Sequence, residues 1–432
     1  MYEHQQRLRG GQFAVWLTSK IQSINFALTA RLHGALNPDQ LRAALDKLRL
    51  KYPTLSMRLT ETAHRQVVLI PDPDLEIPVR LVERRSPEQW VAEVAAELGR
   101  PFDLLNDAPL RLVWLRGEDA SELSFICPHA LADGLSVVYL IRDFLEFLER
   151  PEAAIQPLPP APSMSAGLPD FPRKRWLVWQ FKIKAAVFQC LLKLAPQQPL
   201  PPRKQVAYQL LSWELTPAQT AALIHRSRSE NTTVHAALSA AFLRAFGELR
   251  GNGWKRRLQS PLSLRERLNP PAGEAFGLYV NLVELSVDCA PQRDFWAVAR
   301  EIKQSLARRA ENRHIFRSLI EGNIMMDRLG AVIAPEFVAQ SFLTVAYDLS
   351  ITNLGRLNLP TQAGALQLDA VYGPALGGNP DDIVLGVATV GGEMTFSLAF
   401  TELSLSRSQA EWLKERALQH LETASSTGSS IE

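Results

Sequence analysis

The sequence predicts an α/β protein made of two halves of similar size. Strand-like and helix-like apolar patterns alternate in both parts of the chain. A proline-rich stretch separates them, with seven prolines in residues 151–172 and four more in residues 196–202. The 432 residues, of which 46% are hydrophobic, are enough for more than one domain. We therefore predict an N-terminal half at 1–150, a crossover at 151–204 and a C-terminal half at 205–432.

In the first half, apolar residues at helical spacing and alternating apolar runs follow one another. Asn37 is a suitable N-cap for a helix that begins at Pro38. Helices are expected at 38–52, 87–99 and 135–148, and strands at 24–32, 67–70, 79–82, 110–115 and 123–127. The last of these strands leads directly into the last helix.

The second half repeats the alternation. Helices are expected at 216–230, 232–249, 295–309 and 407–425, and strands at 205–215, 258–264, 279–287, 341–352 and 394–401. The residues from Tyr372 to Pro374, with Gly377 and Gly378, predict a loop that lines a cleft. A cleft between two domains is where ligands most often bind.

Composition excludes several classes of protein. A net charge of +2 with 21% charged residues gives no sign of a nucleic-acid-binding surface. The cysteines Cys127, Cys190 and Cys289 are odd in number and widely separated, which argues against a disulfide framework and a zinc cluster. Cys127 is interpreted as a packing residue. With no signal-like N-terminus and no apolar run of about 18 residues, a cytoplasmic protein is expected.

Residues 173–195 form an unusual segment within the crossover. Tryptophan and aliphatic residues recur there every three or four positions, and the other positions are rich in Lys and Arg. One interpretation is an interfacial helix that lies on an anionic membrane or covers the entrance for an apolar substrate. The other, which we favour, is a helix docked on the body of the protein. Peripheral membrane contact through this segment stays an alternative.

The most informative residue is His129, at the turn that follows the strand at 123–127. Pro128 ends that strand, and Asp133 and Gly134 precede the next helix. Imidazole is the side chain best suited to move a proton near neutral pH. An alternative is that the pattern is structural, with Asp133 as the N-cap of the helix and Gly134 easing the turn.

Five short motifs follow one another along the chain, and the third of them contains His129. They are Leu36-Asn37-Pro38 with Tyr52-Pro53-Thr54-Leu55; Pro101-Phe102-Asp103-Leu104 with Ala108-Pro109-Leu110-Arg111; Pro128-His129-Ala130-Leu131-Ala132-Asp133-Gly134; Phe276-Gly277-Leu278-Tyr279-Val280-Asn281; and Thr352-Asn353-Leu354-Gly355. In this order they resemble the CoA-dependent acyltransferase superfamily. That superfamily includes chloramphenicol acetyltransferase, condensation domains of nonribosomal peptide synthesis, polyketide-associated acyltransferases and wax-ester synthases. The resemblance covers about residues 15 to 420.

The resemblance implies an α+β sandwich type of α/β fold, in which two chloramphenicol acetyltransferase-like halves form a V with a tunnel between them. It also implies transfer of an acyl group from a CoA or carrier-protein thioester to a hydroxyl of a hydrophobic acceptor. No bound cofactor or metal is implied, because acyl-CoA or a phosphopantetheinyl thioester is a co-substrate. Partners would be the thioester, the acceptor and an acyl or peptidyl carrier protein.

The resemblance assigns roles to the motif residues. His129 matches the second histidine of the signature H-H-x-x-x-D-G, which acts as general base, while Pro128 replaces the first. Asp133 and Gly134 match structural positions, and Arg265 is our candidate ion-pair partner for Asp133.

An oxyanion donor remains open among three candidates: Asn353, Thr352, or a backbone N–H near Gly134. The Asn353 segment could equally be an ordinary turn. His235 and His314 are expected to be structural. Two other functions stay open: an amide-forming free-standing condensation domain, and a catalytically silent scaffold that binds a carrier protein or acyl chain.

Overall fold

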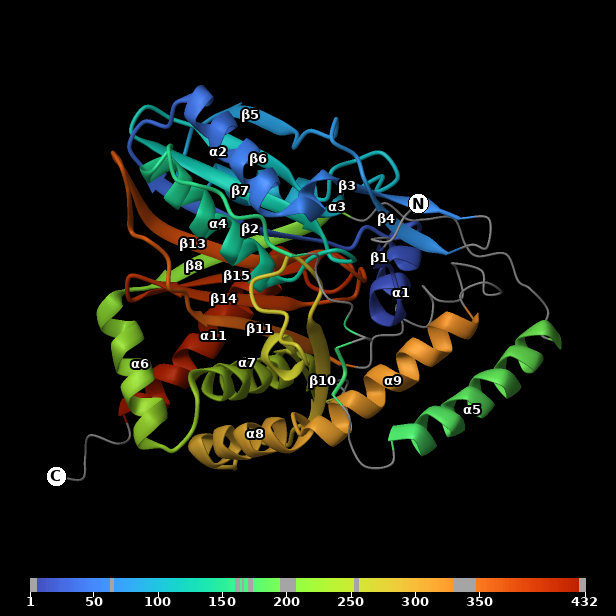
Figure 1. The fold of residues 1–432 in the computed structure, drawn as a ribbon. Helices are drawn as coiled ribbons and strands as arrows, with labels where there is room; N and C mark the ends of the chain where they lie inside the picture. Colours follow the sequence, from blue (N-terminus) through green and yellow to red (C-terminus); the bar gives the residue numbers. More distant parts are fainter. Residues whose placement is uncertain are drawn as a thin grey trace.

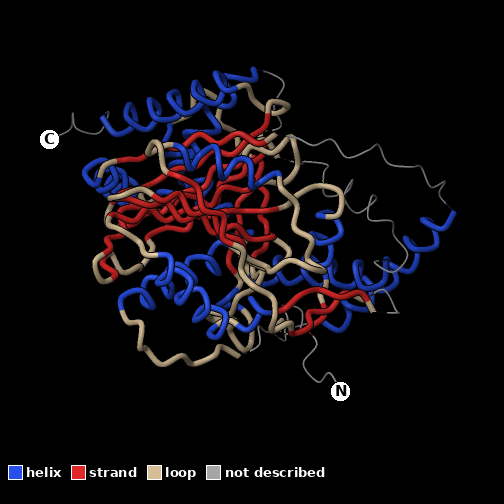
Figure 2. The backbone as a smooth tube through the Cα atoms, turned by 90° about the horizontal axis from the view of Figure 1, so that it is seen from above, coloured by secondary structure: helices blue, strands red, loops and turns tan. Residues whose placement is uncertain are grey.

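Two six-stranded sheets form the centre of the protein (Figure 1). The structure is a computed structural model, and it describes residues 6–62, 66–159, 164, 167–169, 174–194, 207–251, 256–329 and 347–426. Viewed from above, the strands gather in the middle and most helices lie around them (Figure 2). This arrangement confirms the predicted α/β class.

The first sheet carries the strand that leads to His129. Its strands are β2 (Asn25–His33), β5 (Val79–Glu83), β6 (Arg111–Arg116), β7 (Ala120–Pro128), β12 (Gln362–Ala363) and β13 (Leu366–Leu376), in the order β12-β13-β2-β7-β6-β5. Helices α2 (Pro38–Lys51) and α4 (Gly134–Glu149) pack on one face through a large apolar core. Helix α3 (Gln89–Gly99) packs on the opposite face.

The second sheet has the order β10-β9-β11-β14-β15-β8. Its strands are β8 (Tyr208–Leu215), β9 (Arg257–Ser263), β10 (Val280–Ser286), β11 (Leu349–Arg356), β14 (Val384–Val390) and β15 (Glu393–Thr401). Its core is formed with the helices α6 (Pro217–Ser229), α7 (Val234–Arg250), α8 (Phe295–Arg309) and α11 (Arg407–Ser426).

A smaller group of elements lies beside the two sheets. It comprises a three-stranded sheet, β1 (Gln6–Arg7), β4 (Val67–Pro71) and β3 (Met57–Glu61), the short helices η1 (Pro53–Ser56) and η3 (Arg265–Arg267), and the helices α1 (Gly10–Ser19), α5 (Lys174–Leu194) and α9 (Asn312–Leu329). Helix α9 packs between α1 and α5. No helix in the described part of the chain is both long and apolar enough to cross a bilayer.

The two predicted halves of the chain contribute strands to the same sheet and also pack against each other. β13 comes from the predicted C-terminal half, yet it pairs with β2 in the first sheet, from Gln367 opposite His33 to Leu376 opposite Phe26. A third apolar core joins residues of both sheets, and within it Trp90 stacks on Tyr372 at 4.6 Å between ring centroids. Membership in a sheet therefore does not follow chain order at this strand.

The same strand corrects one prediction. The residues Tyr372 to Pro374 were expected in a loop, but they lie within β13. The register shifts between Tyr372 and Ala375, so the glycine and proline mark a bulge. Gly373 has φ +114°, and a Cβ there would lie 2.7 Å from the carbonyl oxygen of Ala27. Glycine is therefore required by the close approach of two strands and not by a surface turn.

Most other predicted elements are confirmed to within a few residues. The Asn37 side chain accepts a hydrogen bond from the Asp39 N–H at 2.8 Å, so it is the N-cap of α2 as expected. The strand predicted at 341–352 is found as β11 from Leu349, and residues 341–346 lie outside the described residues. Much of the proline-rich crossover also lies outside them.

Candidate active site

The turn between β7 and α4 holds His129 in a fixed backbone position. The His129 N–H donates to the Ile24 carbonyl at 2.9 Å, and the Leu131 N–H donates to the Pro128 carbonyl at 3.1 Å. Helix α4 then begins at once, with Asp133 as its N-cap. A strand end and a helix start therefore both constrain this turn, which suits a group that must be held rigidly.

Pro128 fits the end of β7 without losing a ladder hydrogen bond. Because the His129 N–H donates to Ile24 of the β2 segment, the backbone N of Pro128 faces the opposite side, toward β6. Strand β6 begins at Arg111, which lies opposite Ile126, so β6 does not reach as far along β7 as Pro128. The missing N–H of proline therefore leaves no acceptor unsatisfied in β6.

The His129 ring is oriented by one hydrogen bond. Its Nδ1 lies 2.9 Å from the carbonyl oxygen of Ala132, which accepts only, so neutral His129 carries its proton on Nδ1 and has Nε2 as its basic atom. No described residue makes a hydrogen bond to Nε2. The Phe26 ring lies 5.0 Å away. Burial lowers the pKa of His129 below its usual value, more than the Ala132 hydrogen bond and the Asp133 charge raise it.

Asp133 is fully engaged elsewhere. Its Oδ1 accepts from Arg265 Nη2 at 2.7 Å and from the Ser136 N–H at 2.8 Å, and its Oδ2 accepts from the Tyr279 N–H at 3.0 Å. The predicted ion pair of Asp133 and Arg265 is thus present, with both side chains almost completely buried. The His129 ring is oriented by a backbone carbonyl and not by this carboxylate.

Arg265 ties this pair to the second half of the chain. Its Nη1 donates to the carbonyls of Gly273 and Ala275, each at 2.8 Å. Since Asp133 caps α4 and Arg265 lies in η3, the pair joins the helix after His129 to the segment before β10. These contacts, all made through Nη1 and Nη2, are typical of a structural ion pair, while the buried Nε of Arg265 has no hydrogen-bond partner among the described residues.

Gly134 marks where the second sheet approaches α4. A Cβ on Gly134 would lie 3.0 Å from Leu354 Cδ2 of β11, so the Leu354 side chain occupies the space that a larger residue would need. The neighbouring Asn353 uses its Oδ1 to accept from the Gly355 N–H at 2.7 Å. The alternative that the Asn353 segment is an ordinary turn is not what the structure shows, because Thr352 to Gly355 lie in β11, with a register shift after Asn353. Among the described residues, neither Thr352 nor Asn353 makes a hydrogen bond to His129.

Other histidine and cysteine side chains differ from His129 in their surroundings. His235 Nε2 lies 2.9 Å from Ser260 Oγ, and burial lowers the pKa of His235 to about 4. His314 is exposed on α9. Cys127 is completely buried, and burial raises the pKa of its thiol far above the usual range. A buried, protonated thiol agrees with packing.

A cavity of about 1100 Å³ opens between α3 and β8, close to the strand that supports His129. Its lining includes Gln22, Arg100, Pro101, Ser212 and Arg407. His129 itself is not among the lining residues. Its walls include three alanines of α3 and residues of β8, which come from the two halves of the chain, but apart from Pro101 no lining residue belongs to a motif identified in the sequence.

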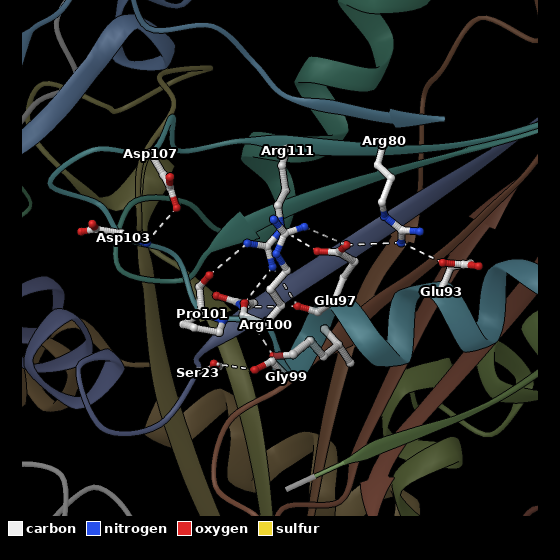
Figure 3. Close-up of polar contacts among 12 residues, drawn as sticks. Ser23, Arg80, Glu93, Glu97, Gly99, Arg100, Pro101, Asp103, Asp107 and Arg111 are labelled. Atoms are coloured by element: carbon white, nitrogen blue, oxygen red, sulfur yellow. Dashed lines mark hydrogen bonds and ion pairs between the residues drawn. The ribbon is translucent and has the colours of Figure 1, made fainter. Parts of the chain in front are cut away.

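A buried arginine fixes the wall of that cavity (Figure 3). Arg111 Nη2 donates to the carbonyls of Arg100 at 2.7 Å and Glu97 at 3.0 Å, and its Nε lies 2.6 Å from Glu97 Oε2. The Asn25 side chain also donates to the Arg100 carbonyl, at 2.6 Å. These bonds hold the end of α3 against β2 and β6. Arg111 was expected only as part of a motif, since nothing in its spacing predicts these acceptors.

Two family matches cover most of the chain. Residues 3–166 match the family described as Condensation domain, and residues 204–372 match the one described as Phthiocerol/phthiodiolone dimycocerosyl transferase C-terminus. The two matches follow one another along the chain in the order of its two halves. In its two halves the chain therefore resembles condensation domains and acyltransferases.

Three solved structures are similar to this chain in fold. Polyketide synthase associated protein 5 from Mycobacterium tuberculosis has a TM-score of 0.64 at 18% identity, over 95% of this chain and 96% of that one. The first condensation domain of the calcium-dependent antibiotic synthetase has a TM-score of 0.72 at 14% identity, over 98% and 97%. The trichothecene 15-O-acetyltransferase from Fusarium sporotrichioides has a TM-score of 0.70 at 12% identity, over 96% and 95%.

The curated relatives that the chain matches are much longer proteins. The nonribosomal peptide synthetase kk1B of Curvularia clavata is 31% identical over 140 residues, which are 31% of this chain and 1% of that protein. The cyclosporin synthetase simA of Tolypocladium inflatum is 23% identical over 310 residues, 68% of this chain and 2% of that protein. The chain therefore spans only a small part of these relatives.

Proposed function

We propose that the protein is an acyltransferase that moves an acyl group from a thioester to a hydroxyl, with His129 as general base. The observation that carries this proposal is the orientation of the His129 ring. Its Nδ1 faces the Ala132 carbonyl, and no described residue makes a hydrogen bond to Nε2. A neutral imidazole with a free Nε2 is the form that accepts a proton.

In the first step, His129 Nε2 removes the proton of the acceptor hydroxyl as its oxygen attacks the thioester carbonyl carbon. The lowered pKa of His129 keeps the ring neutral at pH 7, so the base is ready without prior deprotonation. The new C–O bond gives a tetrahedral intermediate with a negative oxygen, and the imidazolium that forms keeps its hydrogen bond to Ala132.

The negative oxygen needs donors, and two kinds lie in the right part of the fold. Helix α4 begins at Gly134, and the N–H groups of a first helical turn have no acceptor within the helix. The Asn353 Oδ1 is occupied by the Gly355 N–H, which leaves its Nδ2 as a donor. We favour the N–H groups at the start of α4, with Asn353 and Thr352 as alternatives.

In the second step, the intermediate collapses, the C–S bond breaks and the thiolate leaves with both electrons of that bond. The imidazolium of His129 then returns its proton to the thiolate, although a thiol with a pKa near about 8.5 needs little help. The acyl ester and a free thiol are the products, and the histidine is again neutral. No covalent enzyme intermediate is required.

The donor in this proposal is acyl-CoA or the phosphopantetheinyl thioester of a carrier protein, and the acceptor is a hydrophobic alcohol. The names of two similar proteins, a dimycocerosyl transferase and a 15-O-acetyltransferase, support a hydroxyl acceptor. The matches to nonribosomal peptide synthetases support a carrier protein as donor. The cytoplasmic location expected from the sequence stays a prediction.

A second candidate, amide formation with an amine acceptor, is favoured by the match of residues 3–166 to the Condensation domain family. The same base would act in the same way, because a neutral amine that attacks the thioester carbonyl must also give up a proton as the C–N bond forms. The two functions therefore differ in the acceptor and not in the role of His129.

Purified protein tested with a panel of acyl-CoA and acyl-carrier-protein donors would decide between these functions. We expect acceptor-dependent release of free thiol with alcohols, and its loss in His129→Ala. Faster release with amines would favour the condensation reaction instead. Release that is unchanged in His129→Ala would overturn the base, and saturable binding of acylated carrier protein with no turnover would indicate a scaffold.

A further inference from the structure

Helix α5 has two apolar faces, and only one of them is buried. Phe181 and Ala185 are 5% and 0% exposed, and Phe181 belongs to an apolar core with Phe316 and Ile320 of α9. Lys184 of α5 also pairs with Glu321 of α9. The helix is therefore docked on the body of the protein, as the favoured interpretation of the sequence predicted.

The other face of α5 carries a continuous apolar stripe. Trp176, Trp179, Ile183 and Val187 are 52%, 60%, 45% and 55% exposed, and their spacing of three or four residues places them on one side of the helix. The other exposed large apolar side chains of the described residues lie singly on separate elements: Leu50, Leu81, Leu282, Leu403 and Trp412. An exposed apolar stripe of this kind marks an interaction surface.

The charge carried by α5 itself is of one sign. The helix contains five Lys and Arg residues and no Asp or Glu. Arg175 and Lys182 are exposed on α5 and have no ion-pair partner among the described residues. The helix that carries the stripe therefore contributes only positive charge, which complements an anionic surface.

The position of the helix makes the stripe accessible. Figure 1 shows α5 at the edge of the protein, with α9 between it and the sheets. Its 21 residues give it a length of about 32 Å. A long helix held by one face at the periphery presents its opposite face as a rigid, nearly straight edge.

We propose that the outer face of α5 binds the surface of an anionic lipid membrane. Tryptophan is enriched at the boundary between headgroups and acyl chains, and Lys and Arg beside it attract anionic headgroups. Apolar side chains on a helix whose charged residues are all basic fit this chemistry, because a lipid surface offers both acyl chains and negative charge. Docking on α9 and contact with a membrane use opposite faces, so the two interpretations of residues 173–195 are compatible.

Flotation of the full-length protein with vesicles tests this proposal without any measurement of acyl transfer. We expect binding to vesicles of phosphatidylcholine with phosphatidylglycerol, and at least tenfold weaker binding to phosphatidylcholine alone. Trp176→Ala with Trp179→Ala should reduce binding to the anionic vesicles at least tenfold. Trp412→Ala, which removes an exposed tryptophan of α11, is the matched control and should leave binding unchanged.

Replacing Arg175 and Lys182 by Gln tests the electrostatic part. This variant should bind more weakly and should lose much of the dependence of binding on salt concentration. Three results would overturn the proposal: no binding of the wild-type protein to anionic vesicles, equal binding of the Trp176 and Trp179 double variant, or a self-associated wild-type protein that the double variant makes monomeric in sedimentation velocity. The last result would assign the stripe to a second copy of the chain.

Discussion

His129 and His235 make an instructive pair, because burial keeps both rings neutral but only one is free to react. His129 lies before α4 in the first half, and His235 lies in the first turn of α7 in the second half. The His235 Nε2 bonds to Ser260, whereas the His129 Nε2 has no partner among the described residues. A lowered pKa alone therefore does not identify a general base. An available nitrogen on an oriented ring does.

The largest effect expected from this comparison is on catalysis. His129→Ala should lower kcat/KM by about 100-fold to 10,000-fold, since it removes a general base. His235→Gln should change kcat/KM less than about twofold, because an amide can keep the contact with Ser260. The measurement is acceptor-dependent thiol release by the two variants under identical conditions. Equal losses would mean that availability of Nε2 does not distinguish the two histidines.

The next effect is on stability, and it concerns the acid nearest to His129 in sequence. Arg265→Ala leaves the Asp133 carboxylate buried without its cation, so we expect it to lower the free energy of unfolding by about 3–5 kcal/mol. Denaturant unfolding followed by circular dichroism would measure this.

Asp133→Asn sharpens the same point. It should also destabilise the protein, while the folded fraction stays active, because Ala132 and not Asp133 orients the His129 ring. The apparent pKa of the kcat/KM profile should fall only slightly, since the Asp133 charge is a smaller influence on the pKa of His129 than burial and the Ala132 hydrogen bond. A large change in that apparent pKa without loss of stability would assign Asp133 to catalysis after all.

Much of this contrast could be read from the sequence, but not its decisive part. The H-x-x-x-D-G spacing and the strand-to-helix pattern pointed to His129, and the family resemblance suggested Arg265 as the ion-pair partner of Asp133. The Ala132 hydrogen bond could not be predicted, since it depends on the conformation of a single turn. The place of β13 in the first sheet was missed for a related reason. Gly373 and Pro374 are residue types typical of loops, whereas the bulge that they form exists only because β13 pairs with β2.

A smaller effect concerns the pH dependence of the free energy of unfolding, to which His235 contributes. Burial lowers the pKa of His235 to about 4, so between that value and about 6.5 the unfolded chain binds a proton that the folded chain does not. Stability is therefore greatest above pH 6.5 and falls as the pH is lowered, with a contribution of about 2 kcal/mol from His235 at pH 5. His235→Gln should reduce the loss of unfolding free energy between pH 7.5 and pH 5 by about this amount. An identical loss in the variant would mean that the ring titrates normally in the folded protein.

The smallest expected effect concerns Pro128, which stands where relatives carry the first histidine of the signature. Its backbone nitrogen points toward the β6 side of β7, but β6 does not extend as far as Pro128. An N–H at this position would therefore gain no partner in that strand. Pro128→Ala should therefore lower the free energy of unfolding by no more than about 1 kcal/mol, through the greater freedom of the unfolded chain. It should leave kcat/KM within about twofold, because His129 keeps its bonds to Ile24 and Ala132. A large change in kcat/KM at unchanged stability would mean that the stiffness of proline itself sets the position of the base, and the contrast with His235 would then depend on the backbone as much as on the ring.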